Sequence, residues 1–424
     1  MSEKNQLLQV LNAFANYSLK SGTFDYEYED KPFQNLYNAL YKIKEIQEIF
    51  DLDILMYGVQ KAITKRFQKT PIKLEEGNIE EIIPEIIGTL KNNLAEHLIV
   101  VPIQSAQFDK IIKIDNLIFI PQNYSRKEKL KIISRASKKT ISETEWIVGH
   151  TEKSRSEDFL NYPLLVIKQN QQTSTVHYNA LNVAKIIIYS IRCFYYGNIY
   201  KTTKDKKHLI FWSQSSLSEA SHLAIYAKEN WRQNHKPLNF DASVPFDLKW
   251  LEDKKIVKEF KSFLKSIYTE GSLDDFNVTF LNALILYNES IKQNTSISTI
   301  ITMTIAESIL TQNKNEKRLR ISAILPRLLK FKKNEQKKTS KLFDELYQKR
   351  NNFVHSGESV SIDYDFESNE PTILEKGRII IAKLILDYSK FEKIINKEIS
   401  TTNQTTRMKY WESYVDSIFR EIIY

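Results

Sequence analysis

The sequence predicts an α+β protein, with a mixed α/β domain over residues 1–270 followed by an all-α helical bundle over residues 271–424. Two patterns support this division. Short β-branched runs bounded by turn residues, which are typical of strands, fall in the first part of the chain. From Gly271 onward, apolar residues recur almost entirely at spacings of three and four, which is typical of amphipathic helices. Helices of this length packed side by side form a bundle.

Composition narrows the class of protein. The chain has 424 residues, of which 42% are hydrophobic and 27% charged, as is ordinary for a globular protein with a sizeable core. Its one cysteine, Cys193, excludes a disulfide within the chain and a zinc site built on thiolates. Residues 1–6 lack the apolar core of a signal peptide, and no stretch approaches about 18 uninterrupted apolar residues. We therefore expect a soluble, cytoplasmic protein with no membrane partner.

Residues 1–96 are expected to be helical. Helical periodicity is present in residues 6–18, 34–67 and 79–96. In the second segment, one buried stripe is predicted from Leu36, Leu40, Ile43, Ile46 and Phe50. Pro84 is expected within the first turns of the third helix, where its missing N–H costs nothing.

Residues 97–270 are expected to mix strands and helices. The runs that predict strands lie at residues 97–103, 111–121, 162–168, 207–212 and 222–228. The segments with helical patterns lie at residues 125–150, 174–197 and 248–268. Gly197 is expected to stop the second of these helices. Residues 231–247, which are rich in Asn, Pro and Asp, are expected to form a loop.

The bundle is expected to begin with Ser272 as a helix N-cap. Its helices are predicted at residues 272–291, 296–311, 316–331, 335–351, 373–391 and 406–423. Pro326 is expected to interrupt the third of them. A polar insert separates the fourth helix from the fifth.

The net charge of +9 is concentrated in one segment of the bundle. Between Lys314 and Arg350 there are 13 Lys and Arg against 4 Asp and Glu, so this segment accounts for the whole excess. A concentrated basic face is the footprint of a polyanion partner, most often nucleic acid, and the alternative is a solvated helical face. The candidate RNA-binding residues are Lys314, Lys317, Arg318, Arg320, Lys332, Lys333, Lys337 and Lys338.

The basic segment ends near two residues whose side chains are suited to catalysis, Arg350 and His355. On spacing alone, roughly one such pair is expected by chance in this composition. In an uninterrupted helix, residues five apart point about 140° away from each other, and the pair could not serve one site. Because Ser356-Gly357 is a helix C-terminal signal, we expect the helix to end around residues 352–353. His355 would then lie in the following turn and converge with Arg350 on one groove.

Such a pair suits cleavage of RNA without a metal or another cofactor. An imidazole can take the proton of a ribose 2′-hydroxyl or give one to the leaving 5′-oxygen. A guanidinium pairs bidentately with phosphate oxygens and stabilises charge that develops in the transition state. Asn351 is a polar neighbour that could orient His355 or the phosphate. Two copies facing each other across a dimer would supply two histidines and two arginines to one cleft.

The pattern Tyr347-x-x-Arg350-Asn351-x-x-x-His355-x-Gly357, within a helical region, resembles a HEPN domain, and more narrowly the Apea-like group of bacterial HEPN proteins. The helix that carries residues 305–310 and the entry to the next helix at Arg318-Leu319-Arg320 are also similar to that group. The resemblance covers about a third of the chain.

This resemblance implies a dimeric helical bundle and metal-independent endoribonuclease activity with 2′,3′-cyclic phosphate products, commonly in antiphage or toxin systems. It implies that RNA is the substrate, that a homodimer forms through the bundle, and that Arg350, Asn351 and His355 are catalytic. One HEPN subgroup carries a tyrosine two positions after the histidine. Gly357 stands there in this chain, so regulation through modification of such a tyrosine is not expected.

Plainer interpretations of these residues stay open. Arg350 could be a surface cation near a helix C-terminus, and His355 a capping or core histidine. Glu307 and Tyr347 are candidates to support Arg350, although Glu307 could equally face solvent. The charges at positions 318 and 320 are expected to face RNA or the core rather than to be catalytic. The alternative function is a catalytically silent HEPN module that binds RNA or a partner protein.

Residues 1–270 offer no comparable site. Their histidines lack metal-ligand spacing, no Gly-rich loop cradles a phosphate, and no Ser, Cys or Thr lies in a recognisable nucleophile motif. By exclusion, we expect this region to be a sensor or regulatory domain that responds to a phage-derived or cellular trigger.

Overall fold

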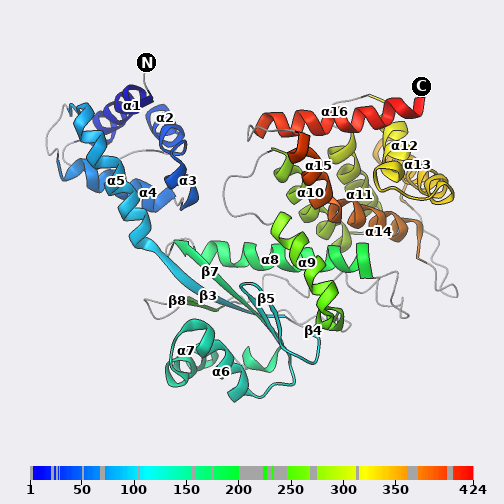
Figure 1. Ribbon diagram of the computed structural model, residues 1–424, viewed down its shortest axis with the longest axis horizontal. Coiled ribbons are helices and arrows are strands. Elements are labelled where there is room, and N and C mark those ends of the chain that lie inside the picture. The colour runs from blue at the N-terminus through cyan, green and yellow to red at the C-terminus, as the bar shows by residue number, and fades with distance from the viewer. Residues whose placement is uncertain are drawn as a thin grey trace.

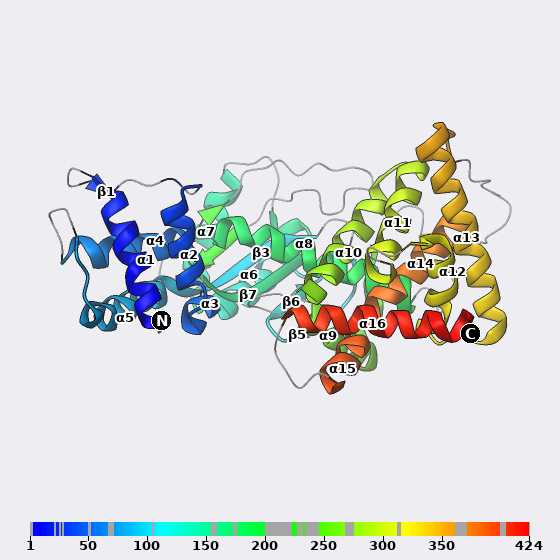
Figure 2. The same ribbon diagram turned by 90° about the horizontal axis from the view of Figure 1, so that it is seen from above.

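A computed structural model describes most of the chain. The described residues are 3–20, 23–24, 27, 29–49, 52–66, 72–103, 106–153, 159–172, 176–199, 223–226, 232–233, 246–267, 275–311, 315–360, 371–398 and 404–423. Helices predominate and accompany a small antiparallel sheet, so the predicted α+β class is confirmed at this level. The N-terminal helices and the C-terminal helices lie at opposite ends of the molecule, with the sheet between them (Figures 1 and 2).

The N-terminal helices form a separate hydrophobic core. They are α1 (Glu3–Ser18), α2 (Lys31–Leu40), α3 (Lys44–Glu48), α4 (Leu52–Thr64) and α5 (Glu76–Asn93), with a short hairpin of β1 (Leu19–Lys20) and β2 (Thr23–Phe24). The helical segment predicted at 34–67 is therefore three helices. Its predicted stripe is buried at Leu36, Leu40 and Ile46, whereas Phe50 lies outside the described residues.

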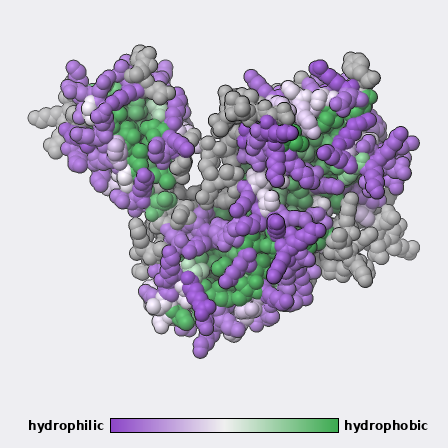
Figure 3. Space-filling model, in the orientation of Figure 1, coloured by the Kyte–Doolittle hydropathy of each residue, from purple (hydrophilic) through white to green (hydrophobic). Residues whose placement is uncertain are grey.

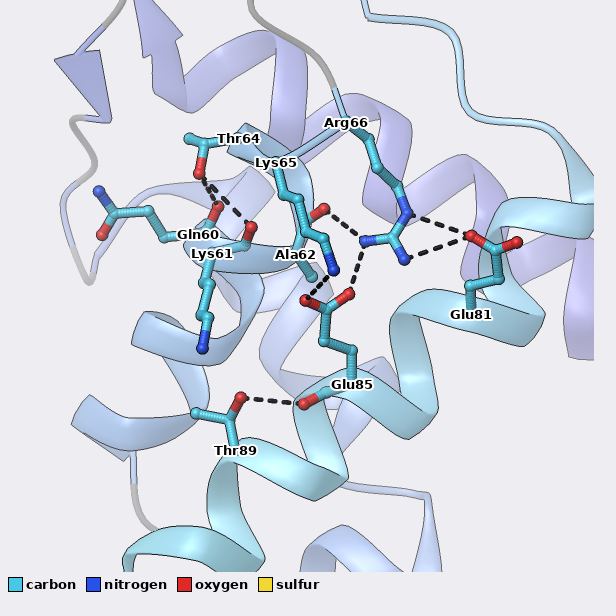
Figure 4. Close-up of polar contacts among 9 residues, drawn as sticks. All are labelled: Gln60, Lys61, Ala62, Thr64, Lys65, Arg66, Glu81, Glu85 and Thr89. Carbon is cyan, nitrogen blue, oxygen red and sulfur yellow. Dashed lines mark hydrogen bonds and ion pairs between the residues drawn. The ribbon is translucent and has the colours of Figure 1, made fainter.

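Helix α5 is tied to the end of α4 by a group of charged side chains (Figure 4). Arg66 Nη1 donates to Glu85 at 2.7 Å and to the carbonyl of Ala62 at 2.9 Å, and its other nitrogens reach Glu81 at 3.3 Å. The side-chain hydrogen bond with Arg66 lowers the pKa of Glu85.

Pro84 lies in the middle of α5 rather than in its first turns, so that prediction was wrong. Its ring is exposed, and the helix continues through it.

The central sheet has six antiparallel strands in the order β5-β6-β7-β3-β8-β9. They are β3 (Leu94–Pro102), β5 (Ile112–Ile114), β6 (Leu117–Ile120), β7 (Leu164–Gln172), β8 (Leu223–Tyr226) and β9 (Arg232–Gln233). The strands predicted at 97–103, 162–168 and 222–228 are confirmed, and the run at 111–121 is the β5–β6 hairpin. The strand predicted at 207–212 lies outside the described residues.

Different helices cover the two faces of the sheet. One face packs against α6 (Arg126–Ser137) and α7 (Ile141–Lys153), and the other packs against α8 (Val176–Phe194). The 3-10 helix η1 (Phe159–Asn161) precedes β7. After α8 come a π-helical turn (Tyr195–Ile199), β10 (Phe246–Asp247), which pairs in parallel with the earlier strand β4 (Ala106–Gln107), the 3-10 helix η5 (Lys249–Glu252) and α9 (Lys254–Ile267). The helices predicted at 125–150, 174–197 and 248–268 are thus present, the first as two helices.

The C-terminal helices pack around a cluster of aromatic rings. They are α10 (Asp275–Lys292), α11 (Thr295–Leu310), α12 (Lys317–Leu328), α13 (Lys333–Ser356), α14 (Ile373–Leu386), α15 (Tyr388–Glu398) and α16 (Gln404–Ile423). Trp411 of α16 packs edge-on against Phe276 and Phe280 and at a tilt against Phe391, and it donates its Nε1–H to the carbonyl of Ile309 at 2.9 Å. This bond locks the last helix onto α11.

Three predicted features of these helices were wrong. Pro326 lies inside α12, two residues before its last residue, and does not interrupt the helix. The helix predicted at 373–391 is broken at Asp387 into α14 and α15. Helix α13 continues five residues beyond its predicted end at residue 351. The predicted N-cap at Ser272 lies outside the described residues.

One hydrophobic core runs from the sheet through α8 into the bundle and therefore crosses residue 270. Gly197 does not stop the helix as predicted but lies inside the π-helical turn, pressed against α14. A Cβ at this position would lie 2.6 Å from Leu386 Cδ1 and 3.0 Å from backbone atoms of Ala382 and Lys383. The close approach of two backbones, rather than a turn, explains this glycine.

Candidate functional site

The two residues of the predicted catalytic pair belong to one continuous helix. Helix α13 ends at Ser356, and Gly357, at φ 70°, caps it by donating its N–H to the carbonyl of Phe353 at 3.0 Å. The predicted helix end at residues 352–353 was wrong. The left-handed glycine stops a helix at the residue directly before it rather than a turn earlier.

Continuation of the helix changes how the pair can act. Arg350 and His355 are five residues apart in α13, so their side chains leave the helix about 140° apart and about 7.5 Å apart along its axis. The predicted convergence of the two side chains within one chain is therefore not found.

Arg350 is held against the neighbouring helix α11. Its side chain is 23% exposed, and its Nη2 lies 3.8 Å from Glu307 Oε1. Its Nη1 donates to Asn351 Oδ1 at 2.9 Å, and the guanidinium lies 5.6 Å from the centre of the Tyr347 ring. Among the described residues, the buried Arg350 Nε has no hydrogen-bond partner. Arg350 is therefore positioned by the protein while one of its N–H groups stays unused.

Glu307 is the carboxylate at the centre of this cluster. Its side chain is 13% exposed, and its Oε2 lies 3.3 Å from Lys317 Nζ, so it faces two cations from two different helices. Burial raises the pKa of Tyr347, and the nearby negative charge of Glu307 raises it further. Of the two predicted environments of Glu307, the structure shows contact with Arg350 rather than exposure to solvent.

His355 has a different environment from Arg350. It is exposed in the last turn of α13. Within the described part of the chain it forms no hydrogen bond or ion pair, while Asn352 on the same turn donates to Glu358 at 3.2 Å. Val354 beside it is a large apolar side chain that is 49% exposed. The imidazole is therefore available to a ligand, next to an uncovered apolar residue.

The basic candidates divide into paired and unpaired side chains. Arg318 pairs with Asp344 through Nη2 at 2.7 Å, and the mostly buried Arg320 pairs with Asp416 of α16 and stacks on Phe419. Lys317 is held by Glu307, as described above. The exposed candidates that form no ion pair within the described ranges are Lys332, Lys333, Lys337 and Lys338. Lys314 lies outside the described residues.

Asp416 is a contact that the sequence did not reveal. It lies 96 residues from Arg320, and the pairing follows from the way α16 crosses α12. Arg320 thus joins α12 to α16 inside the bundle rather than facing a ligand. No local pattern in the sequence could have identified this pair, because neither residue lies at helical spacing from the other.

Two kinds of feature are absent from the described ranges. Among them, no cluster of three or more His, Cys, Asp or Glu side chains could bind a metal ion. In the same part of the chain, no helix has both the length and the apolar character that crossing a bilayer requires. No family model, no curated protein and no solved structure matches the chain. The resemblance to HEPN domains therefore rests on the residues quoted above.

Proposed function

We propose that this protein is a dimeric, metal-independent endoribonuclease of the HEPN type, acting as a defence or toxin effector, with Arg350, Asn351 and His355 at its site. The observation that carries the proposal is that an exposed, unengaged histidine and a pre-positioned arginine lie in the last two turns of one bundle helix. An unengaged imidazole is suited to proton transfer, and an oriented guanidinium to phosphate binding.

The reaction follows from these two groups. The imidazole of His355 removes the proton of a ribose 2′-hydroxyl, and the 2′-oxygen attacks the adjacent phosphorus. The bond from phosphorus to the 5′-oxygen breaks, and that oxygen takes up a proton from solvent, leaving a 2′,3′-cyclic phosphate and a 5′-hydroxyl, while the imidazolium of His355 returns its proton to solvent. Arg350 binds the phosphate oxygens, where its charge stabilises the additional negative charge of the transition state. Asn351 keeps the guanidinium oriented through its hydrogen bond.

A dimer is needed because a single α13 sends the two side chains in different directions. In an isologous dimer, the same surface of each copy forms the contact, so the C-terminal ends of two α13 helices would face each other. His355 of one copy would then reach the phosphate that Arg350 of the other copy binds. The exposed Val354 beside His355 supplies apolar area for that contact.

Control by residues 1–270 is part of the same proposal. Helix α8 packs on the sheet with one side and on α10 and α14 with the other, within a single hydrophobic core. A shift of the sheet on binding a phage-derived or cellular trigger would thus be transmitted through α8 to the bundle. Packed cores transmit such shifts because they are poorly compressible.

The proposal is tested by incubating RNA in EDTA with the wild-type protein and with a His355→Ala variant. The wild type is expected to cut and to leave 2′,3′-cyclic phosphate ends, whereas the variant is expected to be inactive. Asn352→Ala, which changes an exposed residue one turn from the helix end, is the matched control and is expected to retain activity. Equal cutting by all three proteins would exclude the assignment of His355.

A second candidate is a silent module that binds RNA or a partner protein. The observation that favours it is the contact between Arg350 and Glu307, because a carboxylate already occupies part of the guanidinium. The same assay separates the two functions. Binding of RNA without cutting by the wild type, under conditions where the protein is dimeric, would favour the silent module.

A further inference from the structure

We propose that the outward face of α13, from Lys333 to His355, is a track that binds the phosphate backbone of RNA and leads it to the histidine. The inference rests on the proposed function and adds the path of the substrate. It concerns a surface that includes Lys341 and Gln348 and excludes Arg320, whose side chain closes the bundle. Figure 2 shows α13 as a long helix at the end of the molecule farthest from α1.

The track follows from helix geometry. Lys337 and His355 are 18 residues apart, which is five full turns at 100° per residue, so both side chains leave α13 in the same direction. Lys333, Lys341 and Gln348 lie within about 40° of that direction by the same count. The distance from Lys337 to His355 along the axis is about 27 Å at 1.5 Å per residue.

Burial supports this alignment independently. Lys333, Lys337, Lys341, Gln348 and His355 are all exposed. The residues of α13 that are buried are Thr339, Phe343 and Leu346. Those three side chains point to the opposite side of the helix, so the lysines and the histidine share the solvent-facing half. The surface at the edge where α12 and α13 lie is predominantly hydrophilic (Figure 3).

The charge of the track stays positive in spite of one carboxylate on it. Asp344 points within about 20° of the same direction as Lys337. However, the hydrogen bond from Arg318 lowers the pKa of Asp344 and matches its charge. The amide oxygen of Gln348, when it faces α12, accepts from Arg318 Nη1 at 3.2 Å. Arg318 is thereby fixed on the track between the lysines and His355. The exposed carboxylate of Glu345 lies beside the track, about 80° from the direction of Lys337, so the four cations on the track outnumber the nearby carboxylates.

The chemistry of these groups defines the ligand class. Lysines on an exposed helix face act as point charges toward phosphates and do not read base edges. We therefore expect binding that is independent of sequence and strongly dependent on salt. At about 3.4 Å per phosphate along a stacked strand, 27 Å corresponds to about eight nucleotides. RNA much shorter than this cannot contact Lys337 and His355 together.

The test compares two lysine pairs with the same spacing. Lys337→Ala/Lys341→Ala removes two charges from the track, and Lys393→Ala/Lys397→Ala removes two exposed lysines of α15 as the matched control. Both pairs are placed in a His355→Ala background, so that RNA stays intact. Binding of fluorescent RNA is measured by anisotropy in EDTA over a range of salt concentrations, with one RNA longer and one shorter than the track.

The track variant is expected to lower the slope of log K against log salt by about 1.4 for the longer RNA, at about 0.7 per lost phosphate contact. The control pair is expected to leave this slope unchanged, and the shorter RNA to bind more weakly than the longer one because it covers less of the track. If both pairs changed the slope equally, binding would depend on the overall positive charge of the protein rather than on this face of α13, and the track would be overturned. The track would also be overturned if anionic phosphatidylserine vesicles bound more tightly than RNA and this binding depended on the two lysines.

The outcomes also separate the track from the ribonuclease activity. If the wild type binds the longer RNA through Lys337 and Lys341 but does not cut it, the track stands and the ribonuclease proposal fails. If the wild type cuts RNA and the lysine pair changes neither binding nor cutting, the ribonuclease proposal stands and the track fails.

Discussion

Replacement of Glu307 by glutamine is expected to destabilise the protein and, at the same time, to strengthen its binding of RNA. Glutamine keeps the shape of the side chain and removes its charge. Glu307 lies between Lys317 and Arg350 at 13% side-chain exposure, so its removal leaves two partly buried cations without their shared counter-ion. Those cations then become available to phosphate.

The two effects have different magnitudes. Exposed ion pairs contribute about 0.2–1 kcal/mol, and loss of one partner of a fully buried pair costs about 3–5 kcal/mol. A carboxylate with this partial exposure lies between these limits, so Glu307→Gln should lower the free energy of unfolding by about 1–2 kcal/mol. For a phosphate about 6 Å away in water, removal of one repulsive charge is worth about 0.7 kcal/mol, or about three-fold in affinity.

The assays are urea unfolding and RNA anisotropy in EDTA. Glu345→Gln is the matched control, because Glu345 is an exposed carboxylate of α13 that forms no ion pair within the described residues. The control is expected to change the free energy of unfolding by less than about 0.5 kcal/mol. A Glu307→Gln protein that is as stable as the wild type, or that binds RNA more weakly, would refute the role given to this carboxylate.

Two further predictions concern the scaffold. Gly197→Ala is expected to cost about 1–3 kcal/mol through overpacking against Leu386, whereas Gly88→Ala, with open space around its position, should be neutral or slightly stabilising; urea unfolding of both variants checks this. Arg66→Met should weaken the N-terminal helices at neutral pH. Because Arg66 lowers the pKa of Glu85, this contribution is complete above the unfolded carboxyl pKa of about 4.3 and is lost as pH falls through the folded value. The difference between wild type and Arg66→Met should therefore shrink in acid, and a difference that does not depend on pH would contradict the ion pair.

The parts of the fold that the sequence predicted are those that local periodicity reports. Apolar residues at spacings of three and four marked α1, α8 and α11, and β-branched runs marked β3 and β7, because burial of one face selects such residues. Breaks inside long periodic segments were harder to predict. The turn after Leu40 and the break at Asp387 leave the apolar pattern intact, so periodicity alone cannot locate them.

The candidate site shows the same limit. The residue types of the cluster around Arg350 were identified from the sequence, and Glu307 does contact Arg350. The end of α13 was misplaced because the glycine signal was taken to act a turn too early. This difference of four residues keeps Arg350 and His355 on one continuous helix, where their side chains point about 140° apart. The pairing of Arg320 with Asp416 depends on how two distant helices cross and has no local signal.

The central claim, a site shared between two copies, is tested most directly by mixing two inactive variants. Arg350→Ala and His355→Ala proteins are each expected to be inactive. After they are unfolded together and refolded, half of the dimers should be mixed, and one of the two sites in each mixed dimer should contain an intact arginine and histidine. The account predicts recovery of about a quarter of the wild-type cleavage of RNA in EDTA. Mixed dimers that form but recover no cleavage would contradict it.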